Sequence, residues 1–289
     1  MAEPRTAAFT DEHGIEIVYD VHLAPQGTPA RGVVQLLHGV GEHAGRYVRT
    51  IDALTAAGFH VYADDHRGHG RTGMRQHGDA ARLGRLGPGG LRAAAAAVWQ
   101  LTELIRAEHP DLPLVLLGHS WGSFLAQMVL DAHPEAYDAV ILSGSARRTI
   151  RDLNARPLNA RWAGPEADGL EWLSRDPAVW RDFRDDPLTT ETPLLKLFGP
   201  IEAARLYGRP RKDFPKDVPV LLLVGRDDPV GGPRSVHRLA DDYRARSGLT
   251  DITTFVYPEA RHELFHELQQ DEVRADLLAW LDARIPARD

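Results

Sequence analysis

Apolar residues are distributed along the chain in two alternating kinds of segment. Short, mostly continuous apolar runs, typical of buried parallel strands, occur at residues 33–37, 59–63, 113–117, 139–142 and 220–224, and residues 252–257 are predicted to form a further strand. Between them lie helical segments, of which the clearest has apolar residues at steps of three and four: Leu91, Ala94, Val98, Leu101 and Ile105. In residues 14–23 apolar and polar residues alternate, which is typical of a strand with one solvent-exposed face, and we expect this strand at a sheet edge. This alternation predicts an α/β fold with a mostly parallel central sheet and helices on both faces.

Residues 147–212 interrupt this alternation. They show no strand pattern and contain two predicted helix starts, in which an N-capping residue precedes a proline: Asp176-Pro177 and Thr192-Pro193. We therefore expect residues 147–212 to form a helical cap inserted into a core made of residues 1–146 and 213–289.

Composition narrows the classes of function. The formal net charge of −7 argues against nucleic acid and anionic surfaces as partners. The absence of cysteine excludes disulfides, thiolate catalysis and cysteine-ligated metal sites. The first residues lack the apolar core of a signal peptide, and no apolar run approaches the ~20 residues of a membrane span. We expect a soluble, cytoplasmic protein.

The first candidate catalytic residue is Ser120. The run at 113–117 leads into Gly118-His119-Ser120-Trp121-Gly122, and a helical pattern follows. This is the strand–turn–helix context of a GxSxG nucleophile elbow, in which glycines leave room for a strained turn around the serine. The structural alternative is a glycine-bounded turn whose serine only caps a helix.

A serine nucleophile needs a base to take its proton and an acid to orient that base. In α/β-hydrolases these partners follow in the order Ser, Asp/Glu, His. The strand at 220–224 leads into Asp227 and Asp228. The acid usually lies a few residues beyond the strand, which favours Asp228, with Asp227 as the alternative.

His262 is the candidate base because it lies nearest the end of the strand at 252–257. His237 comes before that strand, and His266 lies one helical turn later. Residues 262–266 also match HExxH, the helical zinc site of metalloproteases. That alternative lacks an obvious third ligand and leaves the serine elbow unexplained, so we expect neither a metal nor a cofactor.

The anion that forms during acyl transfer needs two hydrogen-bond donors. One candidate is the backbone N–H of Trp121, directly after the nucleophile. The other is the N–H of Val40 in His38-Gly39-Val40-Gly41, where glycines permit close backbone approach. The structural alternative for this loop is a tight βα turn.

Five sequence blocks resemble one known family. Residues 38–47, HGVGEHAGRY, resemble the HGxGEHxGRY signature of monoacylglycerol lipases and lysophospholipase-like α/β-hydrolases, which group with the so-called serine aminopeptidases. Its other blocks are similar to Asp65–Gly70, Gly118–Gly122, Gly225–Val230 and Ala260–Glu263. The resemblance implies an α/β-hydrolase fold and cofactor-free cleavage of carboxylic esters, with monoacylglycerol or lysophospholipid as the expected substrate class.

The same resemblance implies a role for each candidate residue. Ser120 would be the nucleophile, Asp228 the acid and His262 the base, with Val40 and Trp121 as oxyanion donors. The cap residues expected to line the acyl pocket, or a rim that contacts lipid aggregates, are Trp172, Trp180, Leu194 and Phe198. The structural alternative is that they form the cap's own small core. Alternative functions are a short-chain carboxylesterase or thioesterase, a peptidase, and a non-catalytic binding scaffold.

Overall fold

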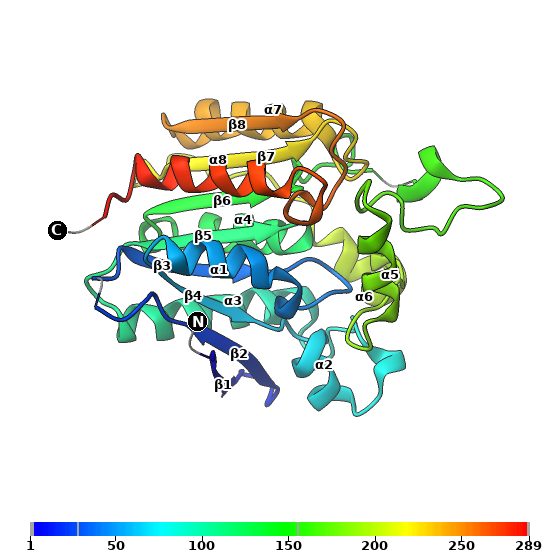
Figure 1. The fold of residues 1–289 in the computed structure, drawn as a ribbon, viewed down its shortest axis with the longest axis horizontal. Helices are drawn as coiled ribbons and strands as arrows, with labels where there is room; N and C mark the ends of the chain where they lie inside the picture. The colour runs from blue at the N-terminus through cyan, green and yellow to red at the C-terminus, as the bar shows by residue number, and fades with distance from the viewer. Residues whose placement is uncertain (1–2, 28, 155, 288–289) are drawn as a thin grey trace.

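The computed structural model describes residues 3–27, 29–154 and 156–287. Within these residues the chain forms one eight-stranded sheet in the order β1-β2-β4-β3-β5-β6-β7-β8 (Figure 1). The strands are β1 (Arg5–Thr10), β2 (Glu16–His22), β3 (Gly32–Leu37), β4 (Phe59–Asp64), β5 (Leu114–His119), β6 (Ala139–Ser143), β7 (Val220–Gly225) and β8 (Ile252–Tyr257). Strands β3 to β8 are parallel, whereas β1 and β2 pair antiparallel at one side.

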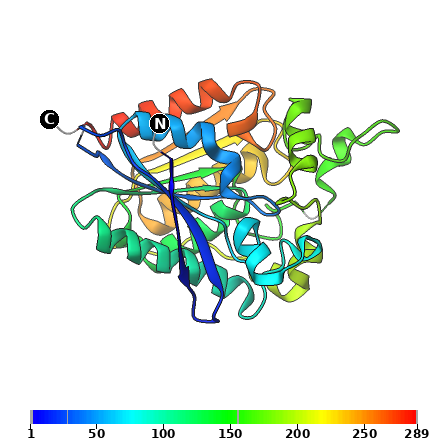
Figure 2. The same cartoon turned by 60° about the horizontal axis from the view of Figure 1, so that its bottom comes forward.

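Helices cover both faces of the sheet (Figures 1 and 2). The α-helices are α1 (Val48–Ala56), α2 (Gly70–His77), α3 (Gly90–Glu108), α4 (Trp121–Ala132), α5 (Pro177–Asp185), α6 (Leu194–Ala204), α7 (Gly232–Asp242) and α8 (Gln270–Asp282). Shorter 3-10 turns span Ala44–Tyr47, Ala80–Arg82, Pro134–Ala136, Leu158–Trp162 and Leu264–His266, and a π-helical turn spans Tyr243–Ser247. Helices α3, α4 and α7 pack on one face, and α1 and α8 pack on the other.

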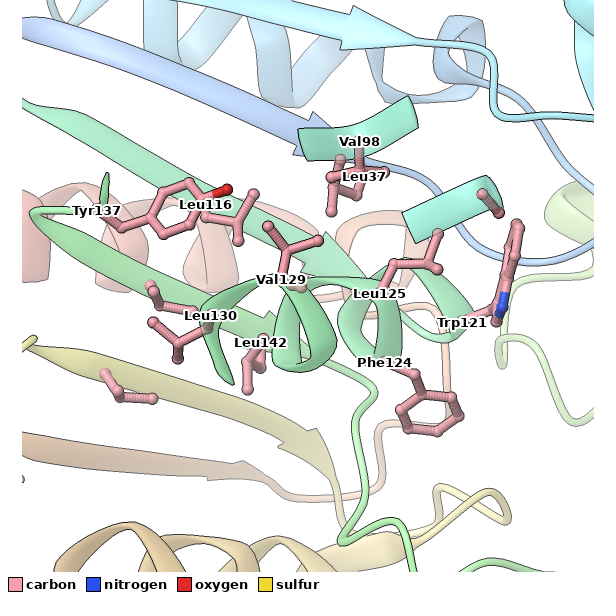
Figure 3. Packing of buried hydrophobic residues seen from close by; sticks show 14 of the residues in the cluster. Leu37, Val98, Leu116, Trp121, Phe124, Leu125, Val129, Leu130, Tyr137 and Leu142 are labelled. Carbon is pink, nitrogen blue, oxygen red and sulfur yellow. The ribbon is translucent and has the colours of Figure 1, made fainter. Parts of the chain in front are cut away.

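The continuous apolar runs of the central strands are explained by this two-sided cover. Side chains alternate between the faces of a strand. In β5, Leu114 and Leu116 pack with α3 and α4, whereas Val115 and Leu117 pack with α1 and α8. Figure 3 shows the hydrophobic cluster that the strands form with α3 and α4, seen around α4. The predicted α/β fold with a mostly parallel sheet is confirmed.

The segment between β6 and β7 supplies α5 and α6 and, in its described residues 147–154 and 156–212, no strand. It lies over the carboxyl ends of the parallel strands (Figure 1). The predicted start of α5 is confirmed, because the Asp176 side chain accepts the Ala178 N–H at 2.9 Å. No described helix has the length and apolar character needed to cross a membrane.

Two expectations about individual elements are wrong. Strand β2 is not at the sheet edge, because β1 pairs along its outer side. The β1 sequence, RTAAFT, is exposed or half-buried throughout and therefore lacks an apolar pattern. Thr192 does not cap α6, since the helix begins at Leu194 and its N-cap, Pro193, forms no side-chain capping bond.

Candidate active site

Ser120 occupies a strained turn between β5 and α4. Its φ of 51° and ψ of −123° place a non-glycine residue in a sparsely populated backbone region. The Ser120 N–H donates to the Ser143 carbonyl at 2.9 Å, which helps to hold the turn. A Cβ on Gly118 would lie 2.6 Å from the Gly122 carbonyl oxygen, and one on Gly122 would lie 2.3 Å from the His38 carbonyl oxygen. The elbow therefore needs glycine on both sides of the serine.

The loops after β7 and β8 bring Asp228 and His262 together. Nδ1 of His262 donates to Oδ1 of Asp228 at 3.0 Å, and this oxygen also accepts the Val230 N–H at 2.8 Å. His262 is 1% exposed and Asp228 is 6% exposed. Among the described residues, the buried Nε2 of His262 has no hydrogen-bond partner. With Nδ1 donating, Nε2 carries the lone pair that a general base needs.

The surroundings of His262 favour its protonated form. Burial lowers the pKa of His262, but the charge and the hydrogen bond of Asp228 outweigh burial and raise the pKa above its ordinary value. Burial, followed by the nearby His262, holds the pKa of His119 well below its ordinary value. The structure therefore places a neutral imidazole beside His262, with the ring centroids 4.9 Å apart.

Gly144 allows these two rings to approach. Its φ is 55°, and a Cβ on it would lie 2.9 Å from Cε1 of both His119 and His262. The sequence pattern does not predict this role, because Gly144 follows β6 and is far along the chain from His262.

Asp227 lies apart from His262. Its side chain is 28% exposed and forms an ion pair with Arg161, which is 63% exposed. Its N–H donates to the Ala260 carbonyl at 3.0 Å. Of the two aspartates left open by the sequence, the structure brings Asp228 to the histidine.

The loop after β3 approaches the nucleophile. A Cβ on Gly39 would lie 3.1 Å from Cβ of Ser120 and 2.7 Å from Oε1 of Glu42. The Gly39 N–H donates to that same Glu42 oxygen at 2.6 Å. Val40 follows directly in this loop, and Trp121 is the first residue of α4. The two backbone amides expected to bind an oxyanion thus come from segments that flank Ser120.

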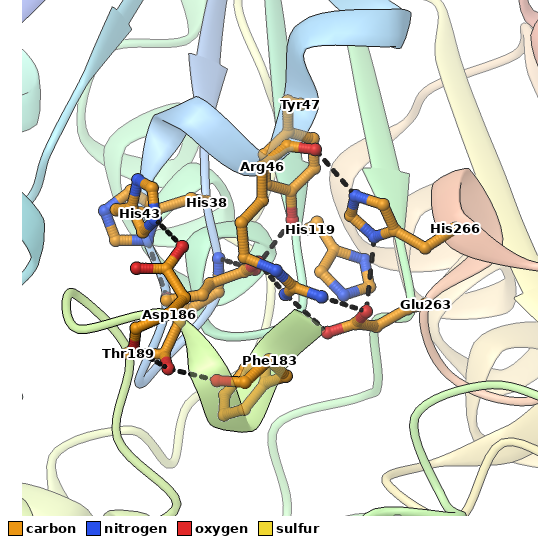
Figure 4. Close-up of polar contacts among 12 residues, drawn as sticks. His38, His43, Arg46, Tyr47, His119, Phe183, Asp186, Thr189, Glu263 and His266 are labelled. Atoms are coloured by element: carbon orange, nitrogen blue, oxygen red, sulfur yellow. Dashed lines mark hydrogen bonds and ion pairs between the residues drawn. The ribbon is translucent and has the colours of Figure 1, made fainter. Parts of the chain in front are cut away.

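A buried ionic network ties this loop to the loop after β8. The Arg46 guanidinium donates to Glu42 at 2.5 Å and to both oxygens of Glu263 at 2.8 and 2.7 Å. Figure 4 shows Arg46 facing Glu263, with His266 beside them. Burial raises the pKa of Glu263, but Arg46 and His266 together outweigh burial and hold the pKa well below its ordinary value. Nothing local in the sequence predicts this pairing.

The zinc-site alternative does not have the required geometry. Residues 262–266 contain only a 3-10 turn at Leu264–His266, not an α-helix that would align two imidazoles. Nδ1 of His262 is bound to Asp228, and Nε2 of His266 lies 2.8 Å from the Arg46 carbonyl oxygen. The described part of the chain contains no cluster of three or more histidine or acidic side chains arranged to hold a metal ion.

Two of the predicted substrate-binding residues lie beside the candidate catalytic groups. The Trp172 ring centroid is 5.0 Å from that of His262. The Phe198 ring centroid is 5.2 Å from that of Trp121. Leu194 is partly buried against the same hydrophobic cluster as Phe198. The cap thus places apolar side chains against both the base and the elbow.

Trp180 lies farther along the same segment, in a cluster against which Trp172 also packs. It packs in the small cluster of the cap, whose buried members are Leu170, Leu173 and Phe183. Its indole N–H donates to the Ser174 carbonyl at 2.7 Å. Trp180 therefore contributes to the cap's own core, while remaining partly exposed.

Comparison with known proteins relates the chain to one family of hydrolases. Residues 28–269 match the family model described as serine aminopeptidase, S33. The chain is 34% identical to a monoacylglycerol lipase of Mycolicibacterium smegmatis, with 95% of each chain covered. It is 27% identical to monoglyceride lipase of Mus musculus, with 91% of this chain and 86% of the relative covered. The resemblance seen in the sequence blocks is confirmed.

Solved structures of related enzymes have the same fold as this chain. A carboxyl esterase from Bacillus coagulans in complex with glycerol superposes with a TM-score of 0.79 at 25% identity, covering 99% of this chain and 100% of that one. A monoglyceride lipase from Saccharomyces cerevisiae superposes with a TM-score of 0.79 at 23% identity, covering 99% and 97%. The fold is the α/β-hydrolase fold, and the chain belongs to the serine aminopeptidase S33 family.

Proposed function

We propose that this protein is a serine hydrolase that cleaves carboxylic esters of the monoacylglycerol type. The observation that carries the proposal is the strained Ser120 elbow together with the buried His262–Asp228 pair, whose contact is 3.0 Å. The relatives named monoacylglycerol lipase and monoglyceride lipase support this substrate class.

The reaction follows from the roles of these groups. Nε2 of His262 takes the hydroxyl proton of Ser120 while the serine oxygen bonds to the ester carbonyl carbon. Asp228 keeps Nδ1 protonated and stabilises the imidazolium. The N–H groups of Val40 and Trp121 bind the oxyanion.

His262 then returns its proton to the leaving alcohol as the ester C–O bond breaks, which leaves an acyl-enzyme. It next takes a proton from water, whose oxygen attacks the acyl carbon. Collapse of that second intermediate transfers the proton back to Ser120 and releases the carboxylic acid.

We assign residues 147–212 to a substrate-binding cap and residues 1–146 and 213–289 to the catalytic core. In the cap, Trp172, Trp180, Leu194 and Phe198 would contribute to an acyl pocket. Contact with lipid aggregates is supported by large apolar side chains of the cap that are exposed: Ile150 (78%), Leu195 (60%), Ile201 (71%) and Tyr207 (43%).

Hydrolysis across acyl lengths tests the proposal. p-Nitrophenyl esters and monoacylglycerols with acyl chains from two to sixteen carbons would be assayed with Ser120→Ala as the blank. A maximum at eight carbons or longer supports a lipid-type substrate. A maximum at two to four carbons indicates a short-chain carboxylesterase, and absence of serine-dependent turnover at any length contradicts ester hydrolysis.

A further inference from the structure

The link between α5 and α6 contacts the loop that carries Val40. Nε2 of His43 lies 2.8 Å from Oδ2 of Asp186, as Figure 4 shows. Further along the same link, the Thr190 N–H donates to the Gly41 carbonyl at 2.8 Å. Two short contacts thus join one segment of the cap to one loop of the core.

His43 donates a hydrogen bond to the cap, so the group that it contacts must be an acceptor but need not carry a charge. Nδ1 of His43 accepts the Gly45 N–H at 3.2 Å, so the ring proton is on Nε2 and points to Asp186. The other Asp186 oxygen accepts the Leu188 N–H at 2.8 Å. The His43 and Asp186 side chains are 11% and 26% exposed, which limits competition from water.

These contacts hold the two peptides that lie one residue before and one residue after those of Val40. On one side, the Gly39 N–H is held by Glu42 at 2.6 Å. On the other, the Gly41 carbonyl is held by Thr190, and a Cβ on Gly41 would lie only 2.4 Å from the Thr190 carbonyl oxygen. The Gly41 φ of 78° requires glycine as well. The Gly39–Val40 peptide, which carries the Val40 N–H, has its carbonyl held by Nδ1 of His38 at 2.7 Å, so the core holds this peptide and the cap holds the Gly41 carbonyl that follows it.

We propose that Asp186 is a positioning residue for the oxyanion hole. By holding His43, it keeps Thr190 against Gly41 and the Val40 N–H directed toward the position of the substrate carbonyl oxygen. This inference rests on the proposed ester hydrolysis. It assigns the cap a part in transition-state stabilisation, in addition to binding the acyl chain.

Steady-state kinetics of three variants test this role. Loss of a whole oxyanion donor lowers kcat by about 10²–10³-fold, so a donor that is present but less firmly positioned should lower kcat by about tenfold. We expect Asp186→Ala to lower kcat by about that factor with KM within about twofold. Asp186→Asn should recover part of the loss, because its amide oxygen still accepts from His43 although its NH2 group cannot accept the Leu188 N–H. The matched control is Asp168→Ala, which removes a cap carboxylate paired with Arg184 at 3.0 Å and should leave kcat unchanged.

Three kinetic results would overturn the proposal: an unchanged kcat in Asp186→Ala, a change in KM alone, or an Asp186→Asn variant as impaired as Asp186→Ala. Hydrogen–deuterium exchange supplies a readout that does not depend on turnover. Because the Thr190 N–H donates to the Gly41 carbonyl, peptides covering residues 187–192 should exchange faster in Asp186→Ala than in the wild type or Asp168→Ala. Unchanged exchange contradicts the anchoring itself, whereas absence of ester hydrolysis in the wild-type protein contradicts the proposed function.

Discussion

Replacing Asp228 by asparagine tests whether Asp228, rather than its neighbour Asp227, is the proposed catalytic acid. The contact of Asp228 with His262 is 3.0 Å long and both side chains are almost completely buried. Because the Val230 N–H holds Oδ1 in place, the Asp228→Asn variant should keep an acceptor toward Nδ1 but lose the negative charge. At an effective dielectric constant of about 20, a charge pair about 4 Å apart is worth about 4 kcal/mol. Loss of that stabilisation of the imidazolium corresponds to about 10³-fold in kcat.

Asp227→Asn is the matched control. Asp227 is partly exposed and paired with an exposed arginine, and such surface pairs contribute about 0–1 kcal/mol. We expect its kcat to stay within about twofold of the wild type. The assay is kcat on a p-nitrophenyl ester at saturating substrate, with thermal unfolding to verify folding. Equal losses in the two variants, or the larger loss in Asp227→Asn, would refute this reasoning.

Three further predictions concern the elbow, the ionic network and pH. Gly122→Ala should lower the unfolding free energy by about 2 kcal/mol or more in urea denaturation, since its Cβ would lie 2.3 Å from a backbone carbonyl oxygen; an unchanged midpoint would contradict the tight elbow. Arg46→Met leaves the buried carboxylate of Glu263 without its arginine partner and should lower the unfolding free energy by about 3 kcal/mol or more, whereas Arg184→Met, at the surface, should leave it nearly unchanged; equal losses would be inconsistent with burial. Because the pKa of His262 is raised and the base must be neutral, kcat/KM should fall as pH is lowered through a value above 6.5; an acid limb below 6.5 would contradict this.

The sequence predicts best those candidate catalytic residues that directly follow a strand. Ser120 and Asp228 each follow a buried apolar strand and His262 follows the half-buried edge strand β8, and parallel strands bring their carboxyl ends to one edge of the sheet. The structure accordingly pairs Asp228 with His262 and sets Ser120 in a strained turn. Their catalytic roles remain predictions for the experiments above.

The elements and contacts that the sequence does not predict have no hydrophobic pattern or motif in the sequence around them. Strand β1 is polar and exposed, and α2, GRTGMRQH, contains two glycines and few apolar residues. The Arg46–Glu263 contact joins residues 217 positions apart. Likewise, Asp186 becomes a partner of His43 only when the cap has folded over the core. Such pairings depend on tertiary packing, which periodicity and motif spacing do not encode.

Covalent labelling of the wild-type protein with a fluorophosphonate, followed by peptide mass spectrometry, tests directly whether Ser120 is the nucleophile. We expect a single adduct on Ser120 and none in Ser120→Ala. An adduct that persists in Ser120→Ala, or a folded wild-type protein that hydrolyses esters but remains unlabelled at Ser120, would contradict the assignment of Ser120 as the nucleophile.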